Sequence, residues 1–196
     1  MAIANDIDPT LVTVGMPAEG GCVWTAFTAP KAFPKDATSK MSTLAEFVSL
    51  GELSANGFTE GKSISTTNHK GWHGKTVVTS VDEETNTVKL EFIEVNRPSV
   101  AKLRYGDKSV TEGEDGSVSK ISDKGYDGKP HPFVIDELES GGFLRRTVIR
   151  KATVTSFDDV PHQRGSIMAY GATLTVNEPD GGEPAIEVFR AKPSEA

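Results

Sequence analysis

The chain has 196 residues, of which 36% are hydrophobic and 25% charged, and its 28 acidic and 21 basic side chains give a net charge of −7. This charge argues against a protein that grips duplex DNA, since such proteins cluster Lys and Arg against phosphates, and the single cysteine, Cys22, excludes an intrachain disulfide framework. The length predicts one domain over residues 1–196, while the lean apolar share with 19 glycines and 11 prolines favours short strands in a subunit that completes its burial in an oligomer.

The first predicted elements are short strands around a long loop. Residues 11–14 and 22–27 predict two strands, with Cys22 as a small buried hydrophobe. The polar loop 28–40 follows, and because ordered loops of this length tend to be functional, we expect it to have a role. Residues 46–51 then predict a short strand that ends in a turn.

The middle of the chain predicts a β-hairpin. Residues 62–68 are β-branched but polar, so we expect them to be exposed or to face a partner. Strands over 76–81 and 87–95 flank a run rich in turn formers, 82–86, which we interpret as the hairpin loop. The second strand has an apolar face and a charged face, namely Val88, Leu90 and Phe92 against Lys89 and Glu91.

One helix is predicted after this hairpin. Asn96 can act as its N-cap, Pro98 fits its first turn, and Gly106 supplies the stop. The charged, glycine-rich insert 107–129 follows, and it predicts a mobile loop or a weak hairpin through 117–122.

The last third of the chain predicts long strands. They cover 132–138, 143–157 and 166–176, with a shorter strand over 185–189. Arg146 and Arg150 fall in the hydrophobic phase of the strand that begins at Phe143. Charges in that phase favour a strand that extends beyond its own core and lies against another subunit.

No pattern in the chain indicates an enzyme. His69 and His73 are four residues apart, but the glycines around them and the missing HExxH glutamate argue against a metal site. The acidic runs lie in predicted turns, and no nucleophile elbow, P-loop or dinucleotide fingerprint occurs. Trp72 lies between glycines, and we interpret it as the anchor of a small satellite core. The sequence therefore predicts no catalysis, no metal and no cofactor.

No targeting segment is recognisable in the sequence. The N-terminus lacks the basic and apolar regions of a signal peptide. No apolar run approaches the ~20 residues that a membrane span needs. We therefore expect no membrane association, and the lone cysteine is consistent with folding in a reducing cytoplasm.

Four segments, taken in order, resemble the major tail tube proteins of long-tailed, non-contractile (siphovirus-type) phages. They are Phe47–Leu53 with Asn56–Glu60, the turn Lys70–Gly74, Glu91–Asn96 with Leu103–Gly106, and the closing strands 145–156 and 165–176 that end in 185–189. Each segment is a weak signal, and their order and spacing carry the resemblance. The loop 28–40 and the insert 107–129 have no counterpart in it.

The resemblance implies a mainly β fold, a β-sandwich or half-barrel with one short flanking α-helix and long loops. It implies a structural virion protein that forms hexameric rings, which stack into a tail tube with a continuous inner β-barrel. DNA would pass through this tube without specific binding. The implied partners are copies of the chain itself, a tape-measure protein, a tail terminator and distal tail proteins. The implied location is the virion tail, assembled in the host cytoplasm, and the family has no catalytic residues to carry over.

Two surfaces of such a tube are assigned to residues here. An acidic lumen repels DNA, whereas a basic lumen holds it. The hairpin 76–95 is the first candidate for the lumen wall. We expect Glu91 to face the lumen and Lys89 to neutralise part of the negative charge there. The closing strands 147–155 and 166–176 are the second candidate. We expect ring-to-ring contacts from the loop 28–40 and, second, from the insert 107–129. The loop residues in question are Pro30, Lys31, Phe33, Pro34, Lys35 and Asp36.

Two other functions fit the same sequence. One is a ligand- or sugar-binding β-sandwich module of a virion or cell surface, which a solvent-exposed Trp72 in a groove would favour. The other is a related tube protein of a secretion system, with the same fold and a different cargo. A neighbouring gene for a very long helical tape-measure protein separates a phage tail from that second alternative.

Overall fold

The computed structural model of the chain describes residues 12–18 and 22–192. The protein is mainly β, with 49% strand and 8% helix, and its strand pairs are antiparallel. Within the described residues the sheet stays open and does not close into a barrel. The predicted class, a β-sandwich-like fold with one short helix, is confirmed.

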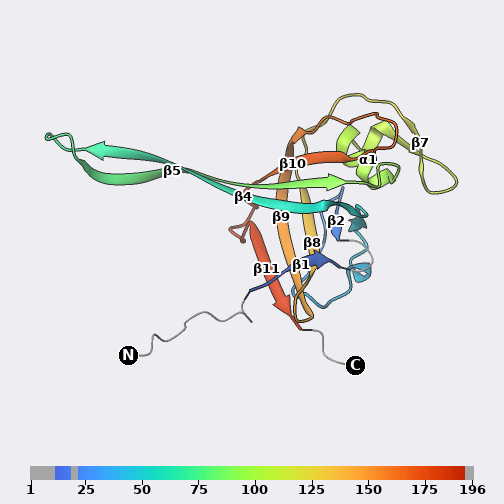
Figure 1. Cartoon of the computed structure of the whole chain (residues 1–196), viewed down its shortest axis with the longest axis horizontal. Helices are drawn as coiled ribbons and strands as arrows, with labels where there is room; N and C mark the ends of the chain where they lie inside the picture. Colours follow the sequence, from blue (N-terminus) through green and yellow to red (C-terminus); the bar gives the residue numbers. More distant parts are fainter. Residues whose placement is uncertain (1–11, 19–21, 193–196) are drawn as a thin grey trace.

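Eleven strands and one α-helix make up the described fold (Figure 1). In chain order they are β1 (Gly15–Pro17), β2 (Val23–Thr25), β3 (Val48–Ser49), β4 (Leu53–Lys70), β5 (Thr76–Phe92), α1 (Pro98–Tyr105), β6 (Val110–Glu112), β7 (Val118–Ile121), β8 (His131–Glu139), β9 (Phe143–Phe157), β10 (Tyr170–Val176) and β11 (Ile186–Ala191).

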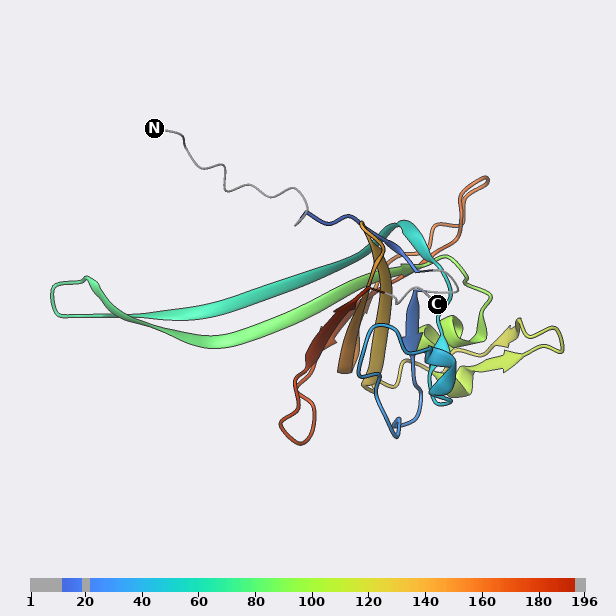
Figure 2. The ribbon, with the colours of Figure 1, turned by 90° about the horizontal axis from the view of Figure 1, so that it is seen from below.

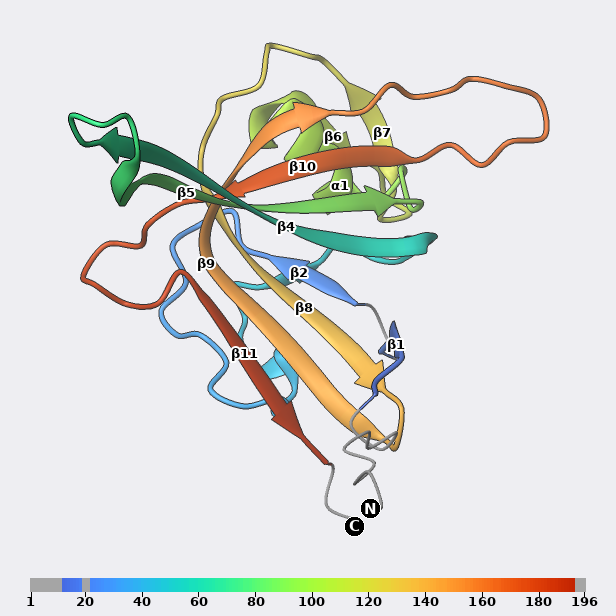
Figure 3. The same ribbon diagram turned by 60° about the vertical axis from the view of Figure 1, so that its left-hand side comes forward.

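The main sheet has the order β3-β2-β8-β9-β10-β5-β4, with β1 added to β8 and β11 added to β9. The long strand β9 joins its two halves. Residues Leu144–Ile149 of β9 pair with β11, and Ala152–Phe157 pair with β10. Figure 3 shows the result: β4, β5 and β10 run across the ends of β8 and β9, and β11 lies alongside the other part of β9. The main core lies where the two halves meet, around Phe92, Phe133 and Ile149.

The helix α1 closes one end of this core. Pro98 disfavours helical geometry at the preceding residue, so Arg97 is extended at φ −73° and ψ 126° and serves as N-cap in place of the predicted Asn96. Gly106 ends the helix at φ 85°, a conformation that favours glycine. Its N–H donates to the carbonyl of Lys102 at 2.8 Å. Val100, Ala101 and Leu103 are buried against the core, and the predicted helix is confirmed.

The predicted hairpin loop at 82–86 is wrong. β5 runs without a break from Thr76 to Phe92, and the turn that joins it to β4 lies at 71–75. The run 82–86 contains turn formers but no glycine, and its side chains bond across the ladder: Thr67 donates to Asp82 at 2.6 Å, and Lys62 pairs with Glu84 at 2.7 Å. Gly74, at φ 75°, supplies the left-handed residue that the real turn requires.

Several smaller predictions have mixed outcomes. The predicted strand 11–14 is wrong for the residues that the structure describes: 12–14 form no strand, and β1 begins at Gly15. Residue 11 lies outside the described residues. The predicted strand 166–176 begins only at Tyr170. The bounds of β9 match the prediction, and the insert 107–129 contains the weak hairpin β6–β7. Cys22 is buried, as expected.

Candidate assembly surface

The most unusual feature of the fold is an arm, which we define as residues 62–86. The strand β10 stops pairing with β5 at Thr87, and beyond that point only β4 and β5 pair with each other. The nine residues 62–70 extend this ribbon about 30 Å at ~3.3 Å per residue. Figures 1 and 2 show it projecting from the body. No residue of the arm is buried, and an isolated two-stranded hairpin is at best marginally stable in water.

Both edges of the arm are open. In the part of the chain that the structure describes, β4 pairs only with β5, and β5 has no second neighbour from Thr76 to Asn86. The free N–H and C=O groups of such edges are templates for strands of another chain. Proline is one device that blocks edge pairing, and neither β4 nor β5 contains one. The arm therefore has the form of an element that another chain completes.

Large apolar side chains are exposed on the arm. By the register of the ribbon, Ile64 and Val81 share one face, whereas Val78 lies on the other. Their exposed fractions are 53%, 65% and 58%. Trp72 at the tip is fully exposed, so its predicted place in a satellite core is wrong. It lies in the turn that joins β4 to β5, at the far end of the arm, whereas a sugar site would place it in a groove.

The outer face of the β4–β5–β10–β9 half is polar and rich in hydroxyls. Val88, Leu90 and Phe92 of β5 are buried, as predicted, so Lys89 and Glu91 lie on the opposite face. Cross-strand pairing surrounds them with threonines, namely Thr59, Thr87, Thr153, Thr155, Thr173 and Thr175.

Lys89 does not act as a free cation on this face. Its Nζ lies 2.8 Å from Asp158, and the hydrogen bond to that carboxylate, followed by its charge, raises the pKa of Lys89. Asp158 reaches this position because residue 171 is glycine: a Cβ there would overlap the Asp158 carboxylate. Glu91 is half-buried beside Gly171 in the cross-strand register. Acidic groups thus outnumber basic ones among these three charged residues.

The loop 28–40 is held against the body. Pro34 is buried, and Phe33 packs edge-on against Phe47 with 6.0 Å between ring centroids, under the guanidinium of Arg150. The Asp36 carboxylate accepts hydrogen bonds from the N–H groups of Thr38 and Ser39, which lowers the pKa of Asp36. Of the six predicted contact residues, those available to a neighbour as exposed side chains are Lys31, Lys35 and Asp36, with Pro30 half-buried.

Arg146 connects this loop to the sheet. It is 4% exposed, and its Nε and Nη2 donate to the Asp136 carboxylate at 2.6 and 2.9 Å. Its Nη1 donates to the carbonyls of Asp36 and Ser39 at 3.0 and 2.9 Å. The expectation that Arg146 carries its strand beyond the core is therefore wrong, because Asp136 on β8 neutralises it inside the subunit.

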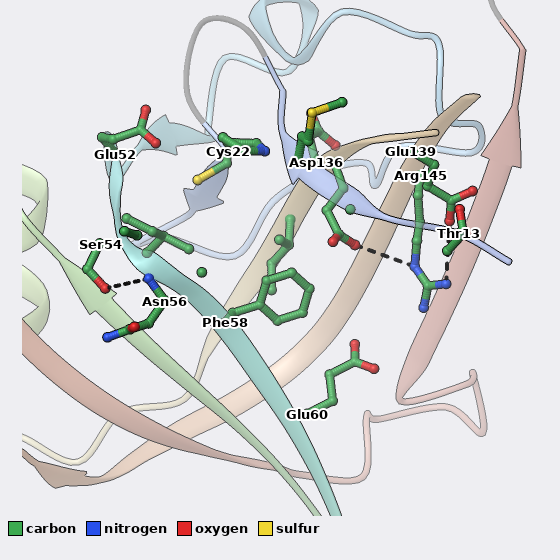
Figure 4. Close-up of a pocket in the computed structure, with 18 residues that line it drawn as sticks. Thr13, Cys22, Glu52, Ser54, Asn56, Phe58, Glu60, Asp136, Glu139 and Arg145 are labelled. Carbon is green, nitrogen blue, oxygen red and sulfur yellow. Dashed lines mark hydrogen bonds and ion pairs between the residues drawn. The ribbon is translucent and has the colours of Figure 1, made fainter. Parts of the chain in front are cut away.

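A cavity of about 530 Å³ lies at the root of the arm, between β1, the start of β4 and β8 (Figure 4). Its apolar lining includes Cys22, Leu53, Phe58 and Ile135. Its charged lining is mostly acidic, namely Glu52, Glu60, Asp136, Glu137 and Glu139 with Arg145. Burial raises the pKa of Glu137, Arg145 opposes this, and the charges of Glu60 and Glu139 add to the rise.

The described residues contain no group of three or more His, Cys, Asp or Glu that could hold a metal ion. His69 instead hydrogen-bonds Ser80 across the arm at 3.1 Å. Burial raises the pKa of the Cys22 thiol, which disfavours the nucleophilic thiolate. Across residues 12–18 and 22–192, no helix is both long and apolar enough to span a bilayer.

Comparison with known proteins adds one finding to this geometry. A family described as "Phage tail tube protein" matches residues 14–195, which is nearly the whole chain. A search of curated proteins gave no match. The resemblance drawn from sequence segments pointed to the same family. The sequence also predicted that residues 62–68 are exposed or face a partner, and the structure shows them exposed, whereas the length of the arm and its turn at 71–75 were not predicted.

Proposed function

This chain belongs to the phage tail tube protein family, and we propose that it assembles into hexameric rings that stack into a tube through which DNA passes to the host. The chain is a structural tail tube protein, and such proteins are not typically enzymes. The observation that carries the proposal is the arm with two open edges, exposed apolar side chains and no core of its own.

Strand addition supplies the assembly mechanism. The open edge of the β4–β5 ribbon gives main-chain hydrogen bonds to a strand of a neighbouring subunit, and apolar side chains such as Ile64 and Val81 become buried in the contact. A head-to-tail contact of this kind closes into a ring when its rotation allows. Closure also removes the open edges that would otherwise promote aggregation.

The hydroxyl-rich outer face of β5 and β10 is our candidate for the lumen wall. Threonine hydroxyls hydrate well and carry no charge to bind phosphates. Lys89 is neutralised by Asp158, and Glu91 adds a negative charge that repels DNA within a Debye length of about 8 Å at physiological salt. The wall then presents no uncompensated cation from this group of residues.

We predict that Glu91→Lys leaves the tube intact and slows DNA release several-fold, because two adjacent lysines facing one aspartate bind phosphates. Glu91→Gln, which removes the charge without reversing it, is the matched control and has a smaller effect. Release from virions built with each variant is followed by the fluorescence of a DNA-binding dye. Equal release rates for Glu91→Lys and the wild type would remove Glu91 from the lumen.

The remaining roles follow from tube assembly. Lys31, Lys35 and Asp36 of the loop 28–40, and then the insert 107–129, supply contacts between stacked rings. The tape-measure protein, tail terminator and distal tail proteins are its partners in the virion tail, and assembly occurs in the host cytoplasm. The whole chain acts as one tail tube domain.

Microscopy of the purified chain tests the proposed function directly. We predict rings or tubes in negative stain at high protein concentration, with sedimentation showing assemblies larger than a monomer. A trigger-dependent, slow transition is compatible with the proposal. A chain that stays monomeric at every salt and protein concentration, with and without the other tail proteins, contradicts it.

A further inference from the structure

The tip of the arm combines a fully exposed indole with positive charge. Lys70 and Lys75 flank the turn and give it a charge of +2, with Trp72 100% exposed between them. Gly74 takes φ 75°, a conformation that favours glycine, and it closes the turn next to the indole. Trp, with Tyr and Arg, is enriched among the residues that carry most of the binding energy at interface centres, where such side chains fill pockets. The tip therefore has the chemistry of an anchor for a pocket that is apolar inside and acidic at its rim.

The cavity at the root of the arm has that complementary chemistry. Its volume of about 530 Å³ lies within the roughly 300–1,000 Å³ of sites that bury small organic groups. Three of its five carboxylates pair with arginines, namely Asp136 with Arg146, Glu137 with Arg145 and Glu139 with Arg190. Five carboxylates against three guanidinium groups leave a charge of −2.

Glu52 and Glu60 account for this remaining charge. Neither side chain pairs with a basic residue among those that the structure describes. Glu52 immediately precedes β4 and Glu60 lies within it, and Figure 4 shows the two side chains apart, with Phe58 between them. The two carboxylates thus match the two lysines of the tip in number and in sign.

The tip of an arm cannot reach the cavity of its own subunit. Leu53, Phe58 and Glu60 line the cavity, and the same strand, β4, runs on from Glu60 to Lys70 at the tip. Ten residues of paired strand hold the tip about 33 Å from the cavity at ~3.3 Å per residue. A second copy of the chain is therefore the occupant that this geometry and charge favour.

We propose that the Trp72 tip of one subunit's arm docks into the acidic root cavity of a second subunit, with Lys70 and Lys75 against Glu52 and Glu60. This inference rests on the proposed self-assembly and names the contact that holds neighbouring copies together. The contact is heterologous, since the tip and the cavity are different surfaces, so each subunit gives one tip and receives another.

A charge exchange in the full-length chain tests the contact. We expect Lys70→Glu with Lys75→Glu to raise the protein concentration needed for assembly at least tenfold, because an acidic tip then faces an acidic cavity. Glu52→Lys with Glu60→Lys has the same effect. The chain that carries all four changes restores assembly, since the charges are complementary again. Arg164→Glu with Lys192→Glu changes the net charge equally at two exposed positions outside the tip, the cavity and the proposed ring-to-ring contacts, and is the control.

Trp72 reports on the same contact directly. We expect its fluorescence to shift to shorter wavelength on assembly, and Trp72→Ala to abolish the shift and to weaken assembly at least tenfold. Circular dichroism confirms that each variant is folded. Two results would overturn this contact while leaving the tube proposal standing. In the first, the wild type assembles and the Lys70→Glu, Lys75→Glu chain assembles equally well. In the second, the chain with all four changes assembles no better than the two double variants. A wild type that never assembles overturns both.

Discussion

A subunit whose arm is cut back to its root is expected to fold normally and to lose the ability to form rings or tubes. The change replaces residues 62–86 with Asn-Gly, so that Gly61 and Thr87, which already pair across the ladder, are joined by a tight hairpin turn. No residue of the arm is buried. Its removal therefore creates no cavity in the core and exposes no new apolar surface.

The expected effect on stability is small. Val88, Leu90 and Phe92, the core residues of β5, stay paired with β10. The lost cross-strand contacts are exposed, and each pair contributes roughly 0.2–1 kcal/mol of stability. The trimmed chain also no longer loses the conformational entropy of ordering a long ribbon, and this gain offsets much of the loss. We expect a net change near 1 kcal/mol, which shifts the Tm of a domain of this size by roughly 2–4 °C.

Assembly, by contrast, is expected to be lost completely. The trimmed chain lacks the two open edges of the arm, its exposed apolar side chains such as Ile64 and Val81, and the Trp72 tip, which together make up the proposed contact. Sedimentation and negative-stain microscopy measure the loss, and circular dichroism with a thermal melt checks the fold. Tubes of normal width from the trimmed chain would show that the arm is not the element that joins subunits.

The arm also shows which parts of a strand can be predicted from the sequence. The alternation of Val88, Leu90 and Phe92 predicted the buried end of β5 because one face of that segment meets the core. Farther out both faces are exposed, no periodicity marks the strand, and turn formers at 82–86 suggested a loop. The glycines at 71 and 74 were the signal for the real turn.

The candidate site was harder to predict from the sequence than the fold. The root cavity is built from residues 13–17 with Cys22, from 52–60, and from 135–139 with Arg145, and no local pattern brings these together. Arg146 is a similar case. Its position in an apolar phase was visible, but its partner Asp136 follows only from the β8–β9 register. Without that register, the sequence cannot distinguish an arginine in a buried ion pair from an arginine that faces another subunit.

The largest expected loss of stability comes from Asp136→Ala. Arg146 is 4% exposed, and Asp136 is its only carboxylate partner within the described residues. Removing one member of a buried pair leaves an uncompensated charge and costs about 3 to 5 kcal/mol. Urea unfolding measures the change as a lower midpoint at constant slope. Lys151→Ala, on the same strand as Arg146, is the matched control: its partner Asp180 is 97% exposed, so the cost stays below about 1 kcal/mol.

Replacing both partners separates the buried charge from the loss of the contact itself. Asp136→Leu with Arg146→Leu is expected to recover much of the stability lost in Asp136→Ala, because no lone charge remains in the interior. Recovery is incomplete, since the carbonyls of Asp36 and Ser39 lose the Arg146 Nη1 donor. The loop 28–40 then detaches from the sheet while the core stays folded, and added protease cuts it faster. A double variant no more stable than Asp136→Ala would mean that the Arg146 contacts to the loop, and not charge neutralisation, hold this part of the subunit together.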